Sequence, residues 1–250
     1  MWKRSDIKSQ AKVNIHRNYW RSVLISLLMI VMAGGITFSY MGEYIPGHPN
    51  LSEAYNFQGL LDQETMIAFA LALIPIVSFV LLISLLLSLA LNILILNPLE
   101  VGANRFFAQN HSKKAQTNEV TFGFEHQYKK IVETMFFRDL YLFLWTLLLI
   151  IPGIVKSYEY RMIIYIMGEQ PEIGREEAFR LSKEMMYGQK WNAFVLDLSF
   201  LGWYLLSVLT LGILDVFYVA PYKNQTNAEL YQVLKKKYNN AQPGNSEVVI

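Results

Sequence analysis

Long apolar runs alternate with short polar stretches along the chain, and two of the runs have the length of membrane-crossing helices. Residues 66–96 contain no Asp, Glu, Lys or Arg, and residues 22–41 are likewise uncharged. About 20 apolar residues cross a hydrocarbon core of about 30 Å, and uncharged runs beyond about 18 residues are unusual in a buried soluble helix. Both runs therefore predict transmembrane helices.

Two later apolar stretches are shorter and broken. Residues 139–167 are interrupted at Pro152-Gly153, and residues 191–222 contain glycines that end helices readily. Because the basic loops around them should stay inside the cell, each stretch is expected to enter and leave the membrane as a pair. The fold class expected is an all-α polytopic membrane protein with about six segments, the last four short or broken: 22–41, 65–96, 139–151, 154–167, 191–208 and 210–222.

Three further stretches have the apolar spacing of an amphipathic helix. In the first of them Ile7, Ala11 and Ile15 recur every four positions and therefore share one helical face. We expect such helices to lie in the membrane interface with the apolar face toward the lipid, although a methionine-containing face also suits a partner protein. The three stretches are 3–18, 122–136 and 175–188.

Charge along the chain predicts its orientation. The first 21 residues carry six Lys or Arg against one Asp, whereas residues 42–64 carry four acidic residues and no basic one. Basic segments stay on the cytoplasmic side, so both termini should be cytoplasmic. The first apolar run is longer than the core of a signal peptide and is expected to remain as an uncleaved span. A single transmembrane domain over 1–240 and a disordered tail at 241–250 complete the expected organisation.

Composition excludes several classes of function. The chain has 250 residues, of which 53% are hydrophobic and 17% charged, against about 25% charged residues in soluble domains. Its net charge of +2 is too small to indicate a nucleic-acid partner. It has no cysteine, and its four histidines lack metal-binding spacing, so no metal and no cofactor are expected. Without an HExxH or GxSxG motif, no enzymatic activity is expected either.

Ionisable residues within the apolar segments are the candidate functional residues, because hydrocarbon penalises a charge by about 2.5–3.5 kcal/mol. We expect them to line a polar site at the helix breaks. The alternative is that they only pair with one another and hold short helices together, as Lys156 and Glu159 can three positions apart on a helix. The candidates are Asp197, Asp215, Lys156, Glu159 and Arg161. Glu100 and Arg105 are expected either to pair at the cytoplasmic mouth or to face water there as two separate charges.

Five segments spread over much of the chain carry a family resemblance: NPLEVGANRFF (97–107), VETMFFRDLY (132–141), LLLIIPGIVKSYEYRM (147–162), EAFRLSKEMMYGQKW (177–191) and LDLSFLGWYLL (196–206). They resemble DUF975, a family of bacterial integral membrane proteins of unknown function. The third and fourth segments are more distantly similar to the membrane domain of glycerophosphodiester phosphodiesterases and to YciC-like proteins. The resemblance implies a multi-span plasma-membrane protein, typically of Gram-positive bacteria, and no established activity.

These observations predict a membrane-embedded binding or transport-associated module. The alternative is a structural or regulatory scaffold that engages a partner protein or lipid through its interfacial helices. The partners expected are a bilayer with an anionic inner leaflet, which suits the basic N-terminal stretch, and a membrane protein or a second copy of the chain. Setting the topology is by itself a sufficient reason for those basic residues.

Overall fold

The computed structural model describes residues 2–34 and 63–241, and every regular element in these ranges is a helix. This confirms the all-α fold class. The chain forms two compact units, residues 1–32 with 93–250 and residues 33–92. Residues 35–41 of the first expected span and most of the expected tail lie outside the described residues; Ala241 itself ends a helix.

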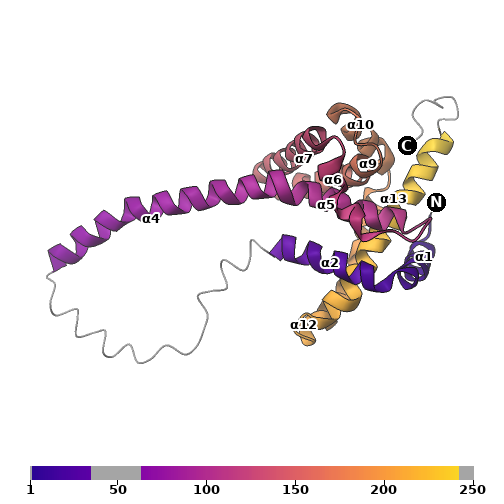
Figure 1. Ribbon diagram of the computed structural model, residues 1–250, viewed down its shortest axis with the longest axis horizontal. Helices are drawn as coiled ribbons and strands as arrows, with labels where there is room; N and C mark the ends of the chain where they lie inside the picture. The colour runs from indigo at the N-terminus through magenta and orange to yellow at the C-terminus, as the bar shows by residue number, and fades with distance from the viewer. Residues whose placement is uncertain (1, 35–62, 242–250) are drawn as a thin grey trace. The chain divides into compact units, whose positions relative to one another are not determined.

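The described part of the second unit is essentially one long helix, α4 (Gln63–Leu91) (Figure 1). Its 29 residues would measure about 43 Å, more than the hydrocarbon core of about 30 Å. Pro75 lies inside α4 without ending it, and the side chains from Leu71 onward are exposed. Within the part of the chain that the structure describes, two helical runs are long and apolar enough to cross a membrane, Leu71–Gln109 and Lys190–Leu209.

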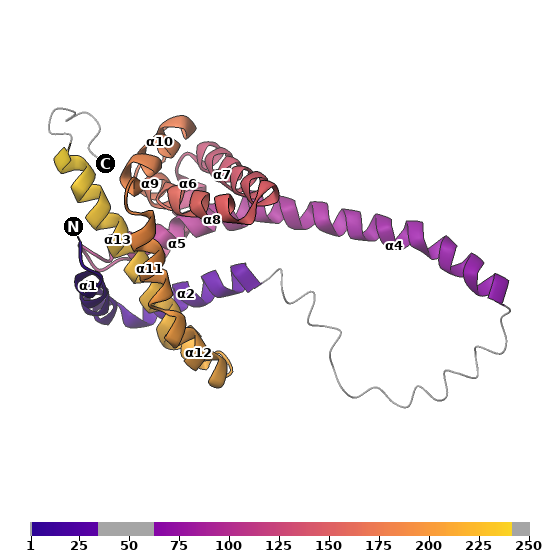
Figure 2. The same cartoon turned by 180° about the vertical axis from the view of Figure 1, so that it is seen from behind.

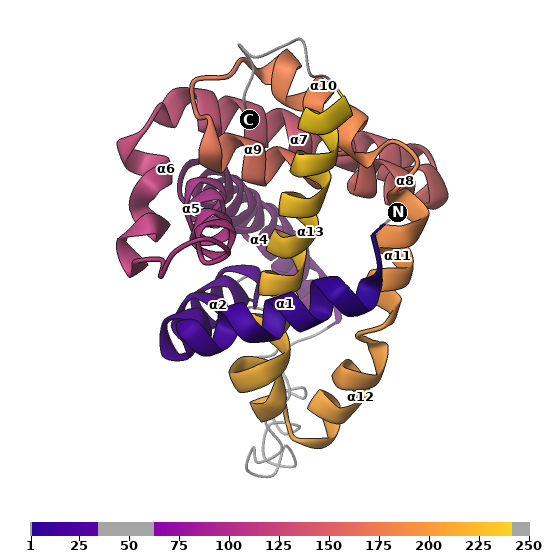
Figure 3. The same cartoon turned by 90° about the vertical axis from the view of Figure 1, so that its right-hand side faces the viewer.

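The first unit is built around α5 (Asn97–Gln109), which follows a π-helical turn at Asn92–Leu96. Phe106 and Phe107 on α5 are fully buried. A Cβ at Gly102 would overlap the backbone carbonyl of Val120, so α5 packs backbone to backbone against the short helix η3 (Thr117–Thr121). Figure 3 shows α5 between α6 (Phe122–Glu125) and α13 (Ala220–Ala241).

Two of the expected interfacial helices do form, as α1 (Arg4–Arg17) and α10 (Arg175–Met186), but their apolar faces do not face lipid. In α1 the predicted stripe is buried, and the helix packs across α13 (Figure 3). In α10 the apolar residues also lie in the protein core, with Leu181 and Met186 fully buried. The amphipathic pattern correctly located an apolar face on each helix, but the protein itself covers that face.

The third expected interfacial helix, 122–136, is not one helix. α6 ends at Glu125, and α7 (Tyr128–Leu148) begins after Gln127, whose backbone is left-handed with φ 48°. A residue in this conformation interrupts the helical hydrogen-bond ladder. α7 then continues without a break into the expected span 139–151.

α7 and α8 (Ile150–Glu159) pack closely as a helical hairpin. The turn is at Leu149, whose backbone is extended, and not at the expected Pro152-Gly153. Pro152 lies in the first turn of α8, where its missing N–H leaves no hydrogen bond unmade. A Cβ at Gly153 would lie 2.5 Å from the Thr146 hydroxyl oxygen, so glycine allows the two helices to approach.

The expected span 154–167 is divided between α8 and α9 (Ile163–Glu169). α9 has seven residues, too few to cross a bilayer, and its apolar side chains lie in the core of the first unit. The segment is therefore not a single span. Its apolar character, which indicated lipid contact, serves packing against α5 and α10 instead.

In a second apolar hairpin, α11 (Lys190–Leu198) followed by α12 (Leu201–Leu209) forms the first arm, and η4 (Asp215–Val219), which leads into α13, forms the returning arm. Its turn contains two residues with positive φ, Leu211 at 50° and Gly212 at 83°. Figure 1 places the end of α12 at the lower edge of the unit, and Figure 2 shows the α7–α8 turn on the side away from α1 and from the end of α13.

Candidate functional site

The base of the two hairpins holds a two-bond ion pair. Arg161, in the turn between α8 and α9, donates Nη1–H to Asp197 Oδ2 at 2.9 Å and Nη2–H to Asp197 Oδ1 at 3.0 Å. The Tyr158 hydroxyl also donates to Asp197 Oδ2 at 2.9 Å, and Arg161 reaches the Asn227 amide oxygen at 2.6 Å. Both side chains of the pair are mostly buried. Two parallel charge-assisted hydrogen bonds of this kind fix the orientation of the two side chains as well as the distance between them.

A second cluster lies beside the first. Lys156 donates to Glu159 Oε1 at 2.8 Å, as the spacing of three residues predicts, and Lys190 pairs with Glu159 Oε2. Glu159 therefore stands between two ammonium groups, one from α8 and one from α11. Four of the five candidate residues are thus brought together in ion pairs, which is the arrangement of the pairing alternative.

Asp215, the fifth candidate, lies at the start of η4, and its Oδ1 is buried without a hydrogen-bond partner. It has no part in the ion pairs that join α8 to α11. The structure therefore separates it from the other four.

The expected pair of Glu100 with Arg105 does not form. Five residues apart on α5, their side chains point about 140° away from each other around the helix. Arg105 pairs instead with Glu119 at 2.7 Å, and Glu100 pairs with Arg138 at 3.2 Å. Arg138 also contacts Asp139, whose Oδ2 accepts a hydrogen bond from the Asn97 amide at 2.8 Å.

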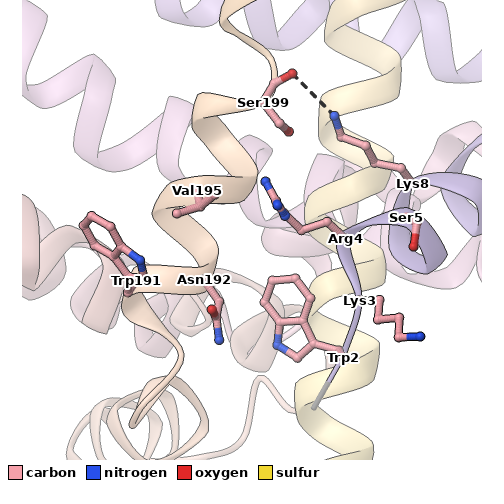
Figure 4. A pocket seen from close by; sticks show the side chains of 9 residues that line it. All are labelled: Trp2, Lys3, Arg4, Ser5, Lys8, Trp191, Asn192, Val195 and Ser199. Carbon is pink, nitrogen blue, oxygen red and sulfur yellow. Dashed lines mark hydrogen bonds between the residues drawn. The ribbon is translucent and has the colours of Figure 1, made fainter.

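A surface hollow of about 740 Å³ lies between the start of α1 and α11. Figure 4 shows Arg4 and Lys8 pointing from α1 toward α11, with Trp2 and Trp191 beside them. Lys8 Nζ lies 3.5 Å from the Ser199 carbonyl oxygen and 4.3 Å from the centroid of the Phe200 ring. The residues lining this hollow include three cations and no carboxylate, and we call it the basic hollow.

Sequence reasoning found the basic character of the N-terminal stretch but not this hollow. The sequence pattern that indicates one wall of the hollow is the spacing of Arg4, Lys8 and Lys12, which recur every four positions and share one face of α1. No local pattern indicated that Trp191 and Asn192, almost 190 residues later in the chain, would form the opposite wall.

Two further hollows lie on the first unit. One of about 680 Å³ is lined by residues near the end of α9, including Glu169 and Glu172, and by Arg105. The other, of about 460 Å³, is lined by Arg21 and Lys114 together with short polar side chains. Both are smaller than the basic hollow and neither combines several cations with aromatic walls.

A buried polar network joins α1, α5 and α13 near the centre of the first unit. Glu229 is almost fully buried and accepts hydrogen bonds from Asn14 at 2.7 Å and from Gln225 at 2.9 Å. His111 Nδ1 lies 2.6 Å from the same carboxylate. The bond to Glu229 raises the pKa of His111 above its ordinary value. Burial favours a higher pKa for Glu229, but the hydrogen bonds from His111, Asn14 and Gln225 outweigh it and lower that pKa.

Within residues 2–34 and 63–241, no group of three or more His, Asp or Glu side chains is placed to hold a metal ion. The basic hollow, rather than the paired charges of the hairpins, is thus the arrangement best suited to an external ligand. Its cations and aromatic rings suit an anionic ligand.

Comparison with known proteins gives one family. A family model described as "Protein of unknown function (DUF975)" matches residues 56–238. Neither a curated protein nor a solved structure matches the chain. Since the matched segment covers well over half of the 250 residues, the chain belongs to the DUF975 family.

Proposed function

We propose that this protein is a membrane-embedded module that binds lipid at the inner face of a plasma membrane. In this proposal α4 crosses the bilayer, and the two apolar hairpins of the first unit enter one leaflet. The observation that supports it is the character of the hairpin turns. Leu147 through Ile151 are each at least 62% exposed, and Leu211 is 93% exposed. Water would not stabilise two such turns, whereas acyl chains would.

The distribution of charge supports insertion of the two hairpins into one leaflet only. Residues 140–155 and 198–214 are uncharged, while Arg138, Lys156 and Lys190 lie at the bases of the hairpins. From Asp139 to Leu148 the helix rises about 15 Å, or about half of the hydrocarbon core. A hairpin of this length reaches the middle of the bilayer and returns, with its charged base at the headgroups.

The ion pairing of the charged residues favours a lipid-binding role over a transport-associated one. Transport requires polar groups that are open to a passing solute. Here Lys156, Glu159 and Arg161 already have protein partners, so their charges hold the hairpins together. The basic hollow keeps cations available for a ligand at the surface.

Single-cysteine labelling tests the insertion, because the chain has no cysteine of its own. Ile151→Cys on α8 and Val208→Cys on α12, each at a position more than 70% exposed, would carry a fluorescent label in lipid vesicles. We expect quenching by nitroxides on the acyl chains and little quenching by aqueous iodide.

The matched control is Glu176→Cys, at an exposed position on α10. Its label should be quenched by iodide and unaffected by the acyl-chain nitroxides. Equal iodide quenching at Ile151→Cys, Val208→Cys and Glu176→Cys would show that the hairpins lie in water and would refute the proposal.

A further inference from the structure

The basic hollow has the electrostatics of an anion-binding site. Arg4 and Lys8 are one helical turn apart and face the same space (Figure 4). Among the described residues Arg4 has no ion-pair partner. Burial, followed by the charges of Arg4 and Lys12, lowers the pKa of Lys8. Repulsion between neighbouring cations is relieved when an anion binds between them.

The walls of the hollow are aromatic and held in place. Trp2 donates its indole N–H to the Gln189 amide oxygen at 2.9 Å, which fixes the N-terminal residues beside α11. Trp191 is 72% exposed at the opposite wall. Tryptophan favours the level of the lipid headgroups, because its ring is apolar and its N–H is polar.

Apolar surface begins where the cationic wall ends. Ser199, whose carbonyl Lys8 approaches, separates α11 from the apolar helix α12. Leu198, Leu201 and Leu205 are each more than half exposed. A ligand with its anionic group at Arg4 and Lys8 would therefore find an apolar surface directly beside it.

The role of α1 narrows the choice of ligand. Its apolar stripe is buried within the protein, so α1 cannot bind the bilayer by inserting that stripe. Its side chains Arg4 and Lys8 point toward α11 and line the basic hollow. We propose that the basic hollow binds the phosphate group of an anionic phospholipid, with the acyl chains lying along the exposed leucines of α11 and α12.

This inference rests on the proposed membrane insertion, since a lipid reaches the hollow only if α12 lies among acyl chains. Full-length protein in neutral detergent micelles would be titrated with phosphatidylglycerol or phosphatidylcholine, and bound lipid counted by native mass spectrometry. We expect saturable binding of one phosphatidylglycerol that the double variant R4Q/K8Q weakens at least tenfold.

Two matched variants separate a specific site from general charge. K236Q/K237Q removes the same two charges at exposed positions of α13 that line none of the three hollows, and it should bind like the unmodified protein. R4K/K8R keeps both charges and should retain most of the affinity. Equal loss in K236Q/K237Q and R4Q/K8Q, or no loss in R4Q/K8Q, would overturn the assignment.

A competition arm distinguishes lipid from free phosphate. Inorganic phosphate and glycerol 3-phosphate at millimolar concentration should displace phosphatidylglycerol poorly, because they lack the acyl chains. Displacement by either at concentrations similar to the lipid would mean that the site takes soluble phosphate, and would refute the lipid assignment. The label at Ile151→Cys, read in the R4Q/K8Q background, reports membrane insertion separately. An inserted label together with unchanged lipid binding would refute only the assignment of the basic hollow and would leave the proposed insertion intact.

Discussion

Arg161 and Asp197 lie face to face and join the bases of the two apolar hairpins. Two hydrogen bonds, at 2.9 and 3.0 Å, connect the turn after α8 to the last turn of α11. Lys190 and Glu159 connect the same two helices a short distance away. The hairpins are therefore held at the level of their charged residues, while their turns remain uncharged and exposed.

Removing one partner of this pair should destabilise the protein. Asp197→Ala leaves a mostly buried guanidinium with Asn227 as its remaining hydrogen-bond partner, and we expect a loss of about 2–3 kcal/mol, below the range for a fully buried pair. The double variant R161M/D197L should lose less, because it leaves no unpaired charge. The thermal unfolding midpoint in detergent micelles measures both.

The control for this prediction is the exposed pair of Arg175 with Glu133, at 3.2 Å. Glu133→Gln should change the stability by less than about 0.5 kcal/mol, since solvent screens exposed ion pairs. If Asp197→Ala proved as mild as Glu133→Gln, the two-bond pair would have no structural role.

The contact of His111 with Glu229 predicts a pH dependence. The folded pKa of His111 is raised above 6.5, so its contribution to stability is present below pH 6.5 and is lost as the pH rises through the folded value. The folded pKa of Glu229 is lowered below 4.5, so its contribution is present above pH 4.5 and is lost as the pH falls. Between about pH 4.5 and 6.5 both contributions are present.

We therefore expect the unfolding midpoint to fall as the pH rises above 6.5 and through the folded pKa of His111, and His111→Gln to flatten that decline. His16→Gln, at an exposed position of α1, is the control and should leave the pH profile unchanged. A profile that is the same in His111→Gln and in the unmodified protein would contradict the predicted linkage.

The hairpin turns predict a position-specific effect of added charge. Leu148→Asp places a carboxylate at an exposed position of the α7–α8 turn, which is harmless in water but costs about 2–3 kcal/mol within hydrocarbon. Membrane extraction with alkaline carbonate should release more Leu148→Asp protein than unmodified protein. Gly174→Asp adds the same charge at the N-cap of α10, where nothing lies within 4 Å, and should extract normally.

Two glycines of the second hairpin should respond oppositely to alanine. Gly212 has φ 83°, so Gly212→Ala would strain the turn by about 1–2 kcal/mol. Gly202 lies inside α12 with open space around it, so Gly202→Ala should stabilise the helix by about 0.5–1 kcal/mol. Thermal unfolding of the two variants compares them directly, and a destabilised Gly202→Ala would indicate that another surface packs on α12.

Several features of the fold could be predicted because they depend on neighbours in the chain. The uncharged run at 65–96 predicted a long apolar helix, and α4 with the turn that follows it is that helix. The spacing of Lys156 and Glu159 predicted their ion pair. In each case a helix of 3.6 residues per turn brings together the residues concerned.

The candidate site could be predicted only in part. The charged residues at the helix breaks were identified, but their long-range partners were not: Arg161 contacts a residue 36 positions later, and Arg105 contacts Glu119 instead of Glu100. The hairpin turn at Leu149 was not predicted either, because proline and glycine interrupt helices far more often than leucine does, which favoured a turn at Pro152 and Gly153. Tolerance of proline in a first helical turn and close packing on Thr146 explain the difference.

The amino-acid sequence by itself determined that this chain is helical, which of its stretches are uncharged, and where each helix carries an apolar face. Tertiary structure alone decided what covers those faces: α1 and α10 turn them into the protein core, whereas the turns of the two hairpins leave them exposed. The reason is that periodicity follows from local backbone geometry, while burial depends on contacts between residues far apart in the chain. The same long-range packing places Trp2, Arg4 and Lys8 beside Trp191.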